Sequence, residues 1–160
     1  MKVTPKIVTP EIVTAEKWHI PHIAAHVRDA DRDEFWAASM HTPEEVLNQA
    51  FAISRLAWTG LIDGVPVCMY GVVDSSTVLM NQGRPWMVGT DLLDKHQVVF
   101  LRRCRASLET MQMCFTKLEN YIDARNVKAI QWLKWLGFSF SEPEPMGPLN
   151  MPFIRFSRGK

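Results

Sequence analysis

The chain has 160 residues, enough for one domain with a hydrophobic core and too few for two of ordinary size. With 47% hydrophobic and 22% charged residues it has a globular composition, and its net charge of +1 argues against a polybasic surface for nucleic acid or anionic membranes. We therefore predict a single domain over residues 1–160 that binds neither.

The first part of the chain predicts one strand and three helices. A strand is expected at Glu11–Ala15, and helices are expected near Pro21–Val27 and Asp31–Ala38. The third helix has the clearest start signal, because Thr42 is a good N-cap and Glu45, three residues later, completes a capping box.

The middle of the chain predicts a hairpin, a loop and a long helix. The Asp63-Gly64 turn joins two β-prone runs, which is a strong hairpin signal. A loop with a brief strand at Val78–Met80 should follow, then a strand at Pro85–Thr90 and one amphipathic helix over residues 91–115. The apolar stripe of that helix consists of Leu101, Cys104, Leu108, Met111 and Phe115.

The last part predicts a strand over residues 117–124, a helix, a strand in "FSFSE", a proline-rich loop and a final strand in "FIRFSR". This element order indicates an α/β protein with a mixed, mostly antiparallel sheet and helices on both faces.

The helix in "NVKAIQWLKWLGF" has well-defined ends. Asn126 is expected to cap its N-terminus, and Gly137 should end it at positive φ. Ala129, Leu133 and Leu136 share one apolar stripe, which we expect to be buried against the sheet.

Cysteine usage and the N-terminus bear on location. Cys68, Cys104 and Cys114 are odd in number and contain no Cys-x-x-Cys pair, so we expect reduced thiols and no zinc site. The stretch "MKVTPKIVTPEIVT" has no signal-peptide core, and no apolar run approaches membrane-spanning length. We expect the protein to stay in the compartment where it is made.

The element order, together with Asn126, Ala129, Gly137 and Phe138 at their spacing, resembles the GNAT acetyltransferase superfamily. The resemblance implies an acyl-CoA N-acyltransferase fold, acetyl-CoA or CoA as the cofactor, and an amine acceptor. It also implies that β-strand residues Met87, Val88, Gly89 and Thr90 pair with the pantetheine arm in a V-shaped opening beside the strand "LENYIDA", with Asn126 at the same site.

A narrower resemblance covers roughly residues 20–157. The stretches "WMVGT", "FLRRCR", "NYIDARN" and "WLKWLGF" are similar to a family of small proteins of short-tailed bacteriophages. Some of those proteins are described as GNAT-like acyltransferases and others as internal virion proteins. The resemblance implies a phage origin, the host bacterial cytoplasm or the virion as the location, and phage structural proteins as partners if the chain is not an enzyme.

One departure from the GNAT pattern falls on the loop that holds the CoA pyrophosphate. Its Arg and three Gly are needed because phosphate approaches the bare backbone closely. Here the corresponding positions are held by Leu93, Asp94, His96 and Val98. We expect His96 to lie at the phosphate end, and Arg102 and Arg103 either to compensate from the next helix or to form a solvated helix face.

A second departure concerns the catalytic groups. Many GNAT enzymes carry a Tyr that protonates the leaving thiolate, seven residues after the Asn, and this chain has Leu133 there. Tyr121 on the preceding strand is a substitute candidate, Glu34 is a candidate general base, and Trp36 is a candidate wall for the acceptor.

Two other groups of residues have side chains that could form a site. His19, His22 and His26 fall at helical spacing, but a proline interrupts them and no further ligand lies nearby, so we expect a polar helix face and no metal. The stretch "RDADRDEFW" contains like-charge pairs such as Arg28–Arg32, which disfavour a simple surface helix.

Three functions follow from these residues: an N-acyltransferase with an unusual phosphate site, a non-catalytic phage virion or assembly protein, and a CoA binder without turnover. Because both departures fall on the chemistry, we predict weak or absent acetyl-CoA turnover.

Overall fold

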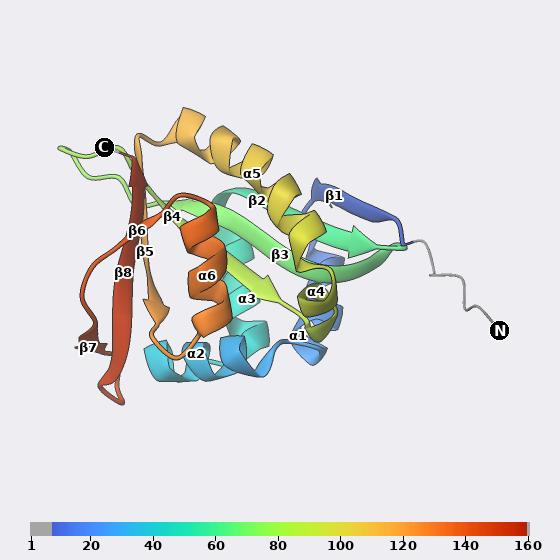
Figure 1. Ribbon diagram of the computed structural model, residues 1–160, viewed down its shortest axis with the longest axis horizontal. Helices are drawn as coiled ribbons and strands as arrows, with labels where there is room; N and C mark the ends of the chain where they lie inside the picture. Colours follow the sequence, from blue (N-terminus) through green and yellow to red (C-terminus); the bar gives the residue numbers. More distant parts are fainter. Residues whose placement is uncertain (1–7, 160) are drawn as a thin grey trace.

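The computed structural model describes residues 8–159. Eight strands form one sheet in the order β1-β2-β3-β4-β5-β8-β6, with β7 paired to β8 (Figure 1). The β4–β5 pair is parallel and the others are antiparallel. The strands are β1 (Pro10–Thr14), β2 (Ser54–Ile62), β3 (Val65–Asp74), β4 (Gln82–Gly89), β5 (Lys117–Asp123), β6 (Ser139–Phe140), β7 (Glu144–Met146) and β8 (Met151–Gly159). The helices are η1 (Lys17–His19), α1 (Ile20–Ala25), α2 (Asp29–Ser39), α3 (Pro43–Ile53), α4 (Asp91–Lys95), α5 (Gln97–Cys114) and α6 (Val127–Trp135).

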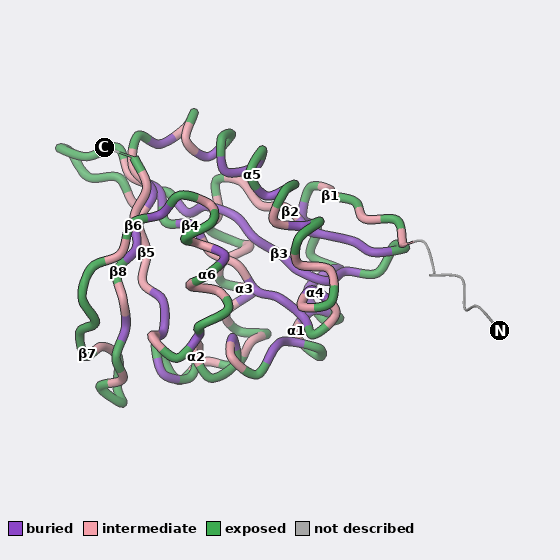
Figure 2. The backbone as a smooth tube through the Cα atoms, in the orientation of Figure 1, coloured by how far each residue is buried: buried purple, intermediate pink, exposed green. Residues whose placement is uncertain are grey.

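Helices cover both faces of the sheet, and each face has its own core. On one face α5 and α6 pack on a cluster that includes Phe100, Leu108, Leu118 and Phe156. On the other, α1 and α3 pack on a cluster that includes Ile23, Leu47, Met69 and Val88. The central strand β3 serves both and is buried along nearly its whole length (Figure 2). The predicted fold class is therefore confirmed.

The turn, the helix cap and the helix end that were predicted from neighbouring residues are confirmed. Asp63 and Gly64 both have positive φ, at 49° and 79°, as a two-residue turn between antiparallel strands requires. The Thr42 hydroxyl accepts a hydrogen bond from the Glu45 N–H and donates one to the Glu45 carboxylate, so it caps α3. Gly137 lies at φ +90°. No helix within residues 8–159 combines the length and apolarity needed to span a bilayer.

Three element predictions are wrong. Val78–Met80 is not a strand, because it lies at the tip of the β3–β4 loop, where Val78 and Leu79 are exposed and find no partner strand. The helix predicted over residues 91–115 is broken at His96 (φ −129°) into α4 and α5. The proline-rich segment contains β7, which forms only because β8 offers an edge for pairing.

Candidate functional site

β4 and β5 separate after a short stretch of pairing. Their parallel ladder reaches Gly83 and Leu118 and goes no further. β4 nevertheless continues to Gly89, and β5 continues to Asp123. The V-shaped opening implied by the resemblance is therefore confirmed, and Figure 1 shows the two strands diverging.

Alternate residues of β4 turn their backbone toward this opening. The Thr90 N–H bonds to β3. The alternation of an antiparallel ladder therefore directs the backbone of Pro85, Met87 and Gly89 away from β3. The Pro85 carbonyl accepts a hydrogen bond from the Asn120 side chain at 2.7 Å, which bridges the narrow end of the opening. Met87 comes next, at a level where β5 no longer pairs with β4.

Gly89, at the wide end, is already bonded. Its N–H donates to Asp31 Oδ2 at 2.9 Å, and its carbonyl accepts from the Arg28 N–H at 2.9 Å. The prediction that Val88–Thr90 offers free backbone groups is therefore wrong, because the first turn of α2 caps the strand end. Of the four residues predicted to pair with pantetheine, Met87 is the one whose backbone faces the opening without one of these bonds.

The Arg28 guanidinium is the centre of a buried cluster. Its Nη1 lies 3.5 Å from Asp31 Oδ1, and its Nε lies 3.2 Å from Asp94 Oδ1. Its Nη2 donates to Asn126 Oδ1 at 3.3 Å, and its carbon lies 4.7 Å from the centre of the Trp132 ring. We call these five residues the arginine cluster. Only 5% of Arg28 and of Asp31 is exposed, so each charge depends on these partners.

Asn126 takes the predicted position but acts differently. It precedes α6, yet its side chain makes no capping bond to the helix. The amide instead accepts from Arg28 and donates to Asp31 Oδ1 at 3.2 Å. Two buried charges compete for the amide more strongly than a helix N–H does, because bonds to charged groups are the stronger ones. The prediction of a side-chain N-cap is therefore wrong.

The predicted phosphate end is filled by protein. α4 follows β4 directly, and Leu93 packs so closely that a Cβ at Gly89 would lie 2.7 Å from it. Asp94 does not repel a ligand as a free charge, because it pairs with Arg28 and with Lys128 Nζ at 3.5 Å. This region therefore does not offer the open backbone that a pyrophosphate requires.

The other predicted phosphate ligands lie outside the central cavity. His96 is half-buried at the α4–α5 break, and Arg102 and Arg103 are exposed on α5. Arg105, one turn further, stacks on the Trp135 ring with 4.0 Å between its carbon and the ring centre. The interaction of these side chains with a phosphate stays a prediction.

A cavity of about 600 Å³ occupies the opening between β4 and β5 and extends between the helices. Strand alternation divides its lining into two lobes. The apolar lobe lies on the α5–α6 face and is lined by Met87, Leu101, Cys104, Leu108, Met111, Ile122, Ala129, Leu133, Leu136, Phe138 and Phe156. The polar lobe lies toward α2 and α3 and is lined chiefly by Glu34, Phe35, Arg84, Trp86, Glu119 and Tyr121.

Glu34 is a carboxylic acid in the lining of the cavity, and its pKa is strongly raised. Burial raises the pKa of its carboxyl to about 8, and the nearby Asp31 and Asp123 carboxylates act in the same direction. The Asp123 N–H, which donates to Glu34 Oε1 at 2.8 Å, opposes the rise. Glu34 is therefore mostly protonated at neutral pH and becomes a base as the pH passes 8.

Of the two aromatic residues predicted near the active site, Tyr121 lines the cavity and Trp36 does not. Tyr121 is half-buried and lines the polar lobe. Trp36 is 46% exposed and is not among the cavity's lining residues, whereas Phe35 is; the prediction of Trp36 as the acceptor wall is therefore wrong. The preceding α2 residue, Phe35, lines the cavity because helical residues one apart face different directions.

The α6 stripe is only partly buried. Ala129, Leu133 and Leu136 are half-buried because they border the cavity, and Trp132 is the buried residue of this helix. The predicted burial of this stripe is therefore only partial, although its residues do pack against the core. Leu133 faces the apolar lobe and supplies no proton donor.

The three histidines at helical spacing do not share one environment. His19 is buried, with its Nδ1 2.8 Å from Thr59 Oγ1, and His22 and His26 stack on the surface with ring centres 4.4 Å apart. Within residues 8–159, no group of three or more His, Cys, Asp or Glu side chains is arranged to hold a metal ion.

Sequence reasoning missed Arg28, Asp31 and Asn120 as site residues. The signal for the first two was the charge density of "RDADRDEFW". The like-charge pairs expected there are replaced by opposite-charge pairs at i,i+3, with Arg32 bonded to Asp29 at 2.7 Å. Asn120 had no local signal, because its role depends on where β4 and β5 separate.

Comparison with known proteins agrees with this architecture. No protein-family model and no curated protein sequence matches the chain. Many solved structures do match. A GNAT-family acetyltransferase from Streptococcus pneumoniae has a TM-score of 0.65 at 11% identity, over 95% of this chain and 100% of that one.

Two further structures match as well. Spermidine N-acetyltransferase from Vibrio cholerae, solved with CoA and spermine, has a TM-score of 0.67 at 11% identity over 94% of this chain and 95% of that one. Ribosomal-protein-alanine N-acetyltransferase from Brucella melitensis has a TM-score of 0.67 at 11% identity over 94% and 99%. The chain therefore has the GNAT fold, the fold of acyl-CoA N-acyltransferases.

Proposed function

We propose that the chain is an acyl-CoA-dependent N-acyltransferase of weak activity with an atypical phosphate end. The observation that carries the proposal is the cavity in the β4–β5 opening. Its lining includes Met87, whose backbone faces the opening, and the residues Glu34 and Tyr121.

The residues fit one part of the donor and not the other. The Met87 N–H and C=O are suited to pair with an amide of the pantetheine arm, as a strand edge pairs with an extended ligand. The diphosphate finds no such groups, because Leu93 and the arginine cluster fill that end. Arg102 and Arg103 then remain as surface partners for the phosphates.

The transfer step needs little from the protein. The amine nitrogen of the acceptor attacks the thioester carbonyl, a C–N bond forms and the C–S bond breaks. Glu34 in its carboxylate form accepts the proton that the nitrogen loses. The thiolate leaves without an acid from α6, because Leu133 cannot donate and a thiol pKa near 8.5 permits departure as the anion. The resulting rate is low, because Glu34 is mostly protonated at neutral pH.

Thiol release with acetyl-CoA and a panel of amines tests this function. We expect turnover below about 1 s⁻¹, rising with pH through about 8 as Glu34 ionises. Glu34→Gln should remove that rise, whereas Glu109→Gln on the exposed face of α5 should leave it in place. Turnover near 1 s⁻¹ or above at neutral pH contradicts the view that the site is impaired.

Two further sets of substitutions test proton donation to the leaving thiolate and phosphate binding separately. Leu133→Tyr should raise turnover, because it places a hydroxyl at the cavity. The double change Arg102→Ala and Arg103→Ala should weaken CoA binding and leave binding of S-acetyl-pantetheine unchanged, as measured by calorimetric titration. Loss of both ligands together would mean that the arginines support the fold and not the phosphates.

A second candidate function is a non-catalytic phage virion or assembly protein that reuses the fold. The observation in its favour is that Asp31 and Arg28 already occupy the Gly89 backbone. The phage resemblance supports the same candidate, with the host bacterial cytoplasm or the virion as its location. This candidate would be favoured over the enzyme if calorimetry detects no binding of acetyl-CoA at millimolar concentration and the protein is found in purified virions.

A further inference from the structure

We propose that the acyl donor carries a medium-length hydrocarbon chain, of about octanoyl size, and that the apolar lobe holds this chain. The inference rests on the proposed function and names its donor. It concerns the acyl group itself, which is bound on the α5–α6 side of the opening.

The lobe is long enough for such a chain. Its lining on α5 runs from Leu101 to Met111, which spans ~15 Å at the helical rise per residue. An acetyl group would fill a small part of that length. Apolar space left empty destabilises a folded protein in proportion to its volume, so a space of this size is better explained by a ligand than by loose packing.

The apolar lobe offers a ligand van der Waals contacts, and the polar groups that border it are already hydrogen-bonded within the protein. The Tyr70 hydroxyl, which borders it, is bonded to Ser107 Oγ at 2.8 Å, and the Trp132 Nε1 donates to Gln97 at 2.9 Å. Burial raises the pKa of the Cys104 thiol to about 11, so it is neutral at physiological pH. A polar ligand would lose its hydration here without compensation, whereas a hydrocarbon chain gains from burial.

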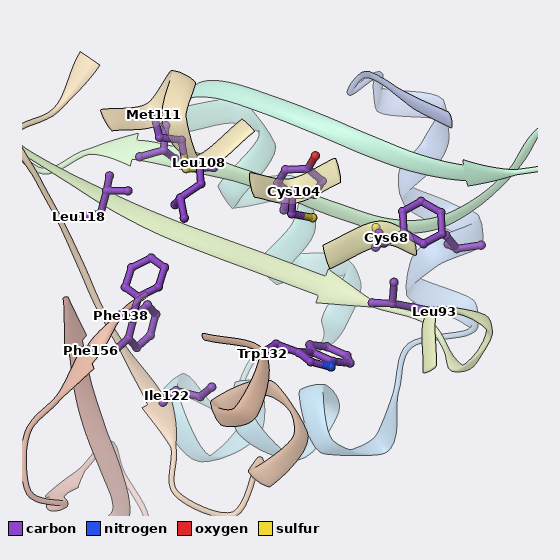
Figure 3. Close-up of a cluster of buried hydrophobic side chains, with 14 of the residues drawn as sticks. Cys68, Leu93, Cys104, Leu108, Met111, Leu118, Ile122, Trp132, Phe138 and Phe156 are labelled. Atoms are coloured by element: carbon purple, nitrogen blue, oxygen red, sulfur yellow. The ribbon is translucent and has the colours of Figure 1, made fainter. Parts of the chain in front are cut away.

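The lobe joins the place of the thioester and has a far wall. Met87 contributes its side chain to the lobe and its free backbone to the opening, so a chain can run from one to the other. Phe138 and Phe156 meet edge to face, with ring centres 5.2 Å apart, among the lining side chains. Figure 3 shows Cys104, Leu108 and Met111 projecting from α5, and Trp132, Phe138 and Phe156 coming from other elements of the same cluster. The wall sets an upper limit to the chain.

A chain-length series tests the proposal by calorimetric titration of the full chain. The probes are the S-acetyl, S-butanoyl, S-octanoyl and S-palmitoyl thioesters of pantetheine, which carry no diphosphate. Each buried methylene should tighten binding about fourfold, so octanoyl should exceed acetyl by at least about 100-fold, and palmitoyl should lose part of this gain. The same series is then measured on CoA. Weaker binding of octanoyl-CoA than of octanoyl-pantetheine would overturn the assignment of CoA as the donor's carrier in the proposed function and would leave the inference about the acyl chain standing.

A matched pair of variants locates the chain. Ala129→Phe should fill the lobe, lower octanoyl affinity by about 10-fold or more and change acetyl affinity little, while the melting temperature does not fall. Ala106→Phe, on the exposed face of α5, should change neither affinity. Leu133→Phe is the second filling variant and replaces the first if that does not fold.

The outcomes separate the two proposals. Equal affinity for acetyl and octanoyl thioesters, or an equal effect of Ala129→Phe on both, overturns the inference and leaves the proposed function standing. Silence with every thioester overturns the proposed function, and the inference falls with it. A rise with chain length that Ala129→Phe removes supports both.

Discussion

The arginine cluster and the apolar lobe lie on the two sides of Met87, and they differ in how they fill the opening between β4 and β5. On the Gly89 side the arginine cluster brings buried charges together and bonds the free strand end. On the α5–α6 side the apolar lobe leaves space and satisfies the polar atoms that border it. The first region closes the opening where a diphosphate would lie, and the second keeps it open where an acyl chain would lie.

The difference teaches that loss of one ligand contact need not mean loss of the site. Buried charges need partners whether or not a ligand is bound, so removing one partner from the arginine cluster should destabilise the fold. Apolar side chains around a cavity gain little until something fills it. The arginine cluster should therefore respond to mutation in stability, and the apolar lobe should respond in binding.

The largest expected effect comes from removing the centre of the arginine cluster. Arg28→Met leaves the buried Asp31 without its cation and removes the shorter of the two ion pairs of the partly exposed Asp94, and should lower the free energy of unfolding by about 3–5 kcal/mol. Arg32→Ala, which breaks an exposed pair with Asp29, should cost less than ~1 kcal/mol. Urea unfolding measures both, and similar losses would show that the cluster is no more important than a surface pair.

Asn126→Ala should come next. It removes the amide that bonds both Arg28 and Asp31, with an expected loss of about 2–3 kcal/mol, because bonds to charged groups are strong. Asn48→Ala on α3 removes one exposed bond to a helix carbonyl and serves as the control. A loss for Asn126→Ala no larger than that of the control would contradict the assigned role of the amide.

Glu34→Gln should stabilise the protein by an amount that grows with pH. The pKa of Glu34 is raised from 4.5 to about 8, so the folded state binds its proton more tightly than the unfolded state does. The resulting stability is complete below pH 4.5 and is lost as the pH rises through 8. Because Gln does not titrate, the variant should gain on the order of 4 kcal/mol at pH 9 relative to pH 5. If the difference in melting temperature between Glu34→Gln and the natural protein does not change with pH, Glu34 ionises normally.

The smallest expected effect is at Gly137, at the C-terminal end of α6, which does not itself line the cavity although its two neighbours do. Gly137→Ala should cost about 1 kcal/mol, because Ala is strained at positive φ. The nearest atom to an added Cβ is 3.5 Å away, so no steric clash contributes. Equilibrium unfolding should show this loss with unchanged thioester binding, and a change in binding would mean that α6 transmits strain to the apolar lobe.

Patterns that depend on neighbouring residues were predictable from sequence. The Thr42 cap, the Asp63-Gly64 turn and the positive φ of Gly137 each follow from local geometry. The element order predicted the sheet, and the resemblance to GNAT acetyltransferases implied its opening. The candidates Glu34 and Tyr121 do line the cavity.

Features that depend on distant partners were not predictable. The side chain of Asn126 is drawn from its helix by Arg28, which lies 98 residues earlier in the chain. The bonds that occupy Gly89 come from the first turn of α2, and neither periodicity nor a motif could reveal that contact. The cavity itself leaves no pattern, since Leu133 reads as a core residue whether it meets a side chain or a space.

Amide hydrogen exchange at Met87 and Gly89 tests the central claim most directly. In the free protein the Gly89 amide should be protected by its bond to Asp31, and the Met87 amide should exchange quickly. Saturating S-octanoyl-pantetheine should protect Met87 and leave Gly89 as it was. If the thioester binds without protecting Met87, or if binding exposes Gly89 by breaking its bond to Asp31, the division between an open strand edge and a closed strand end is wrong.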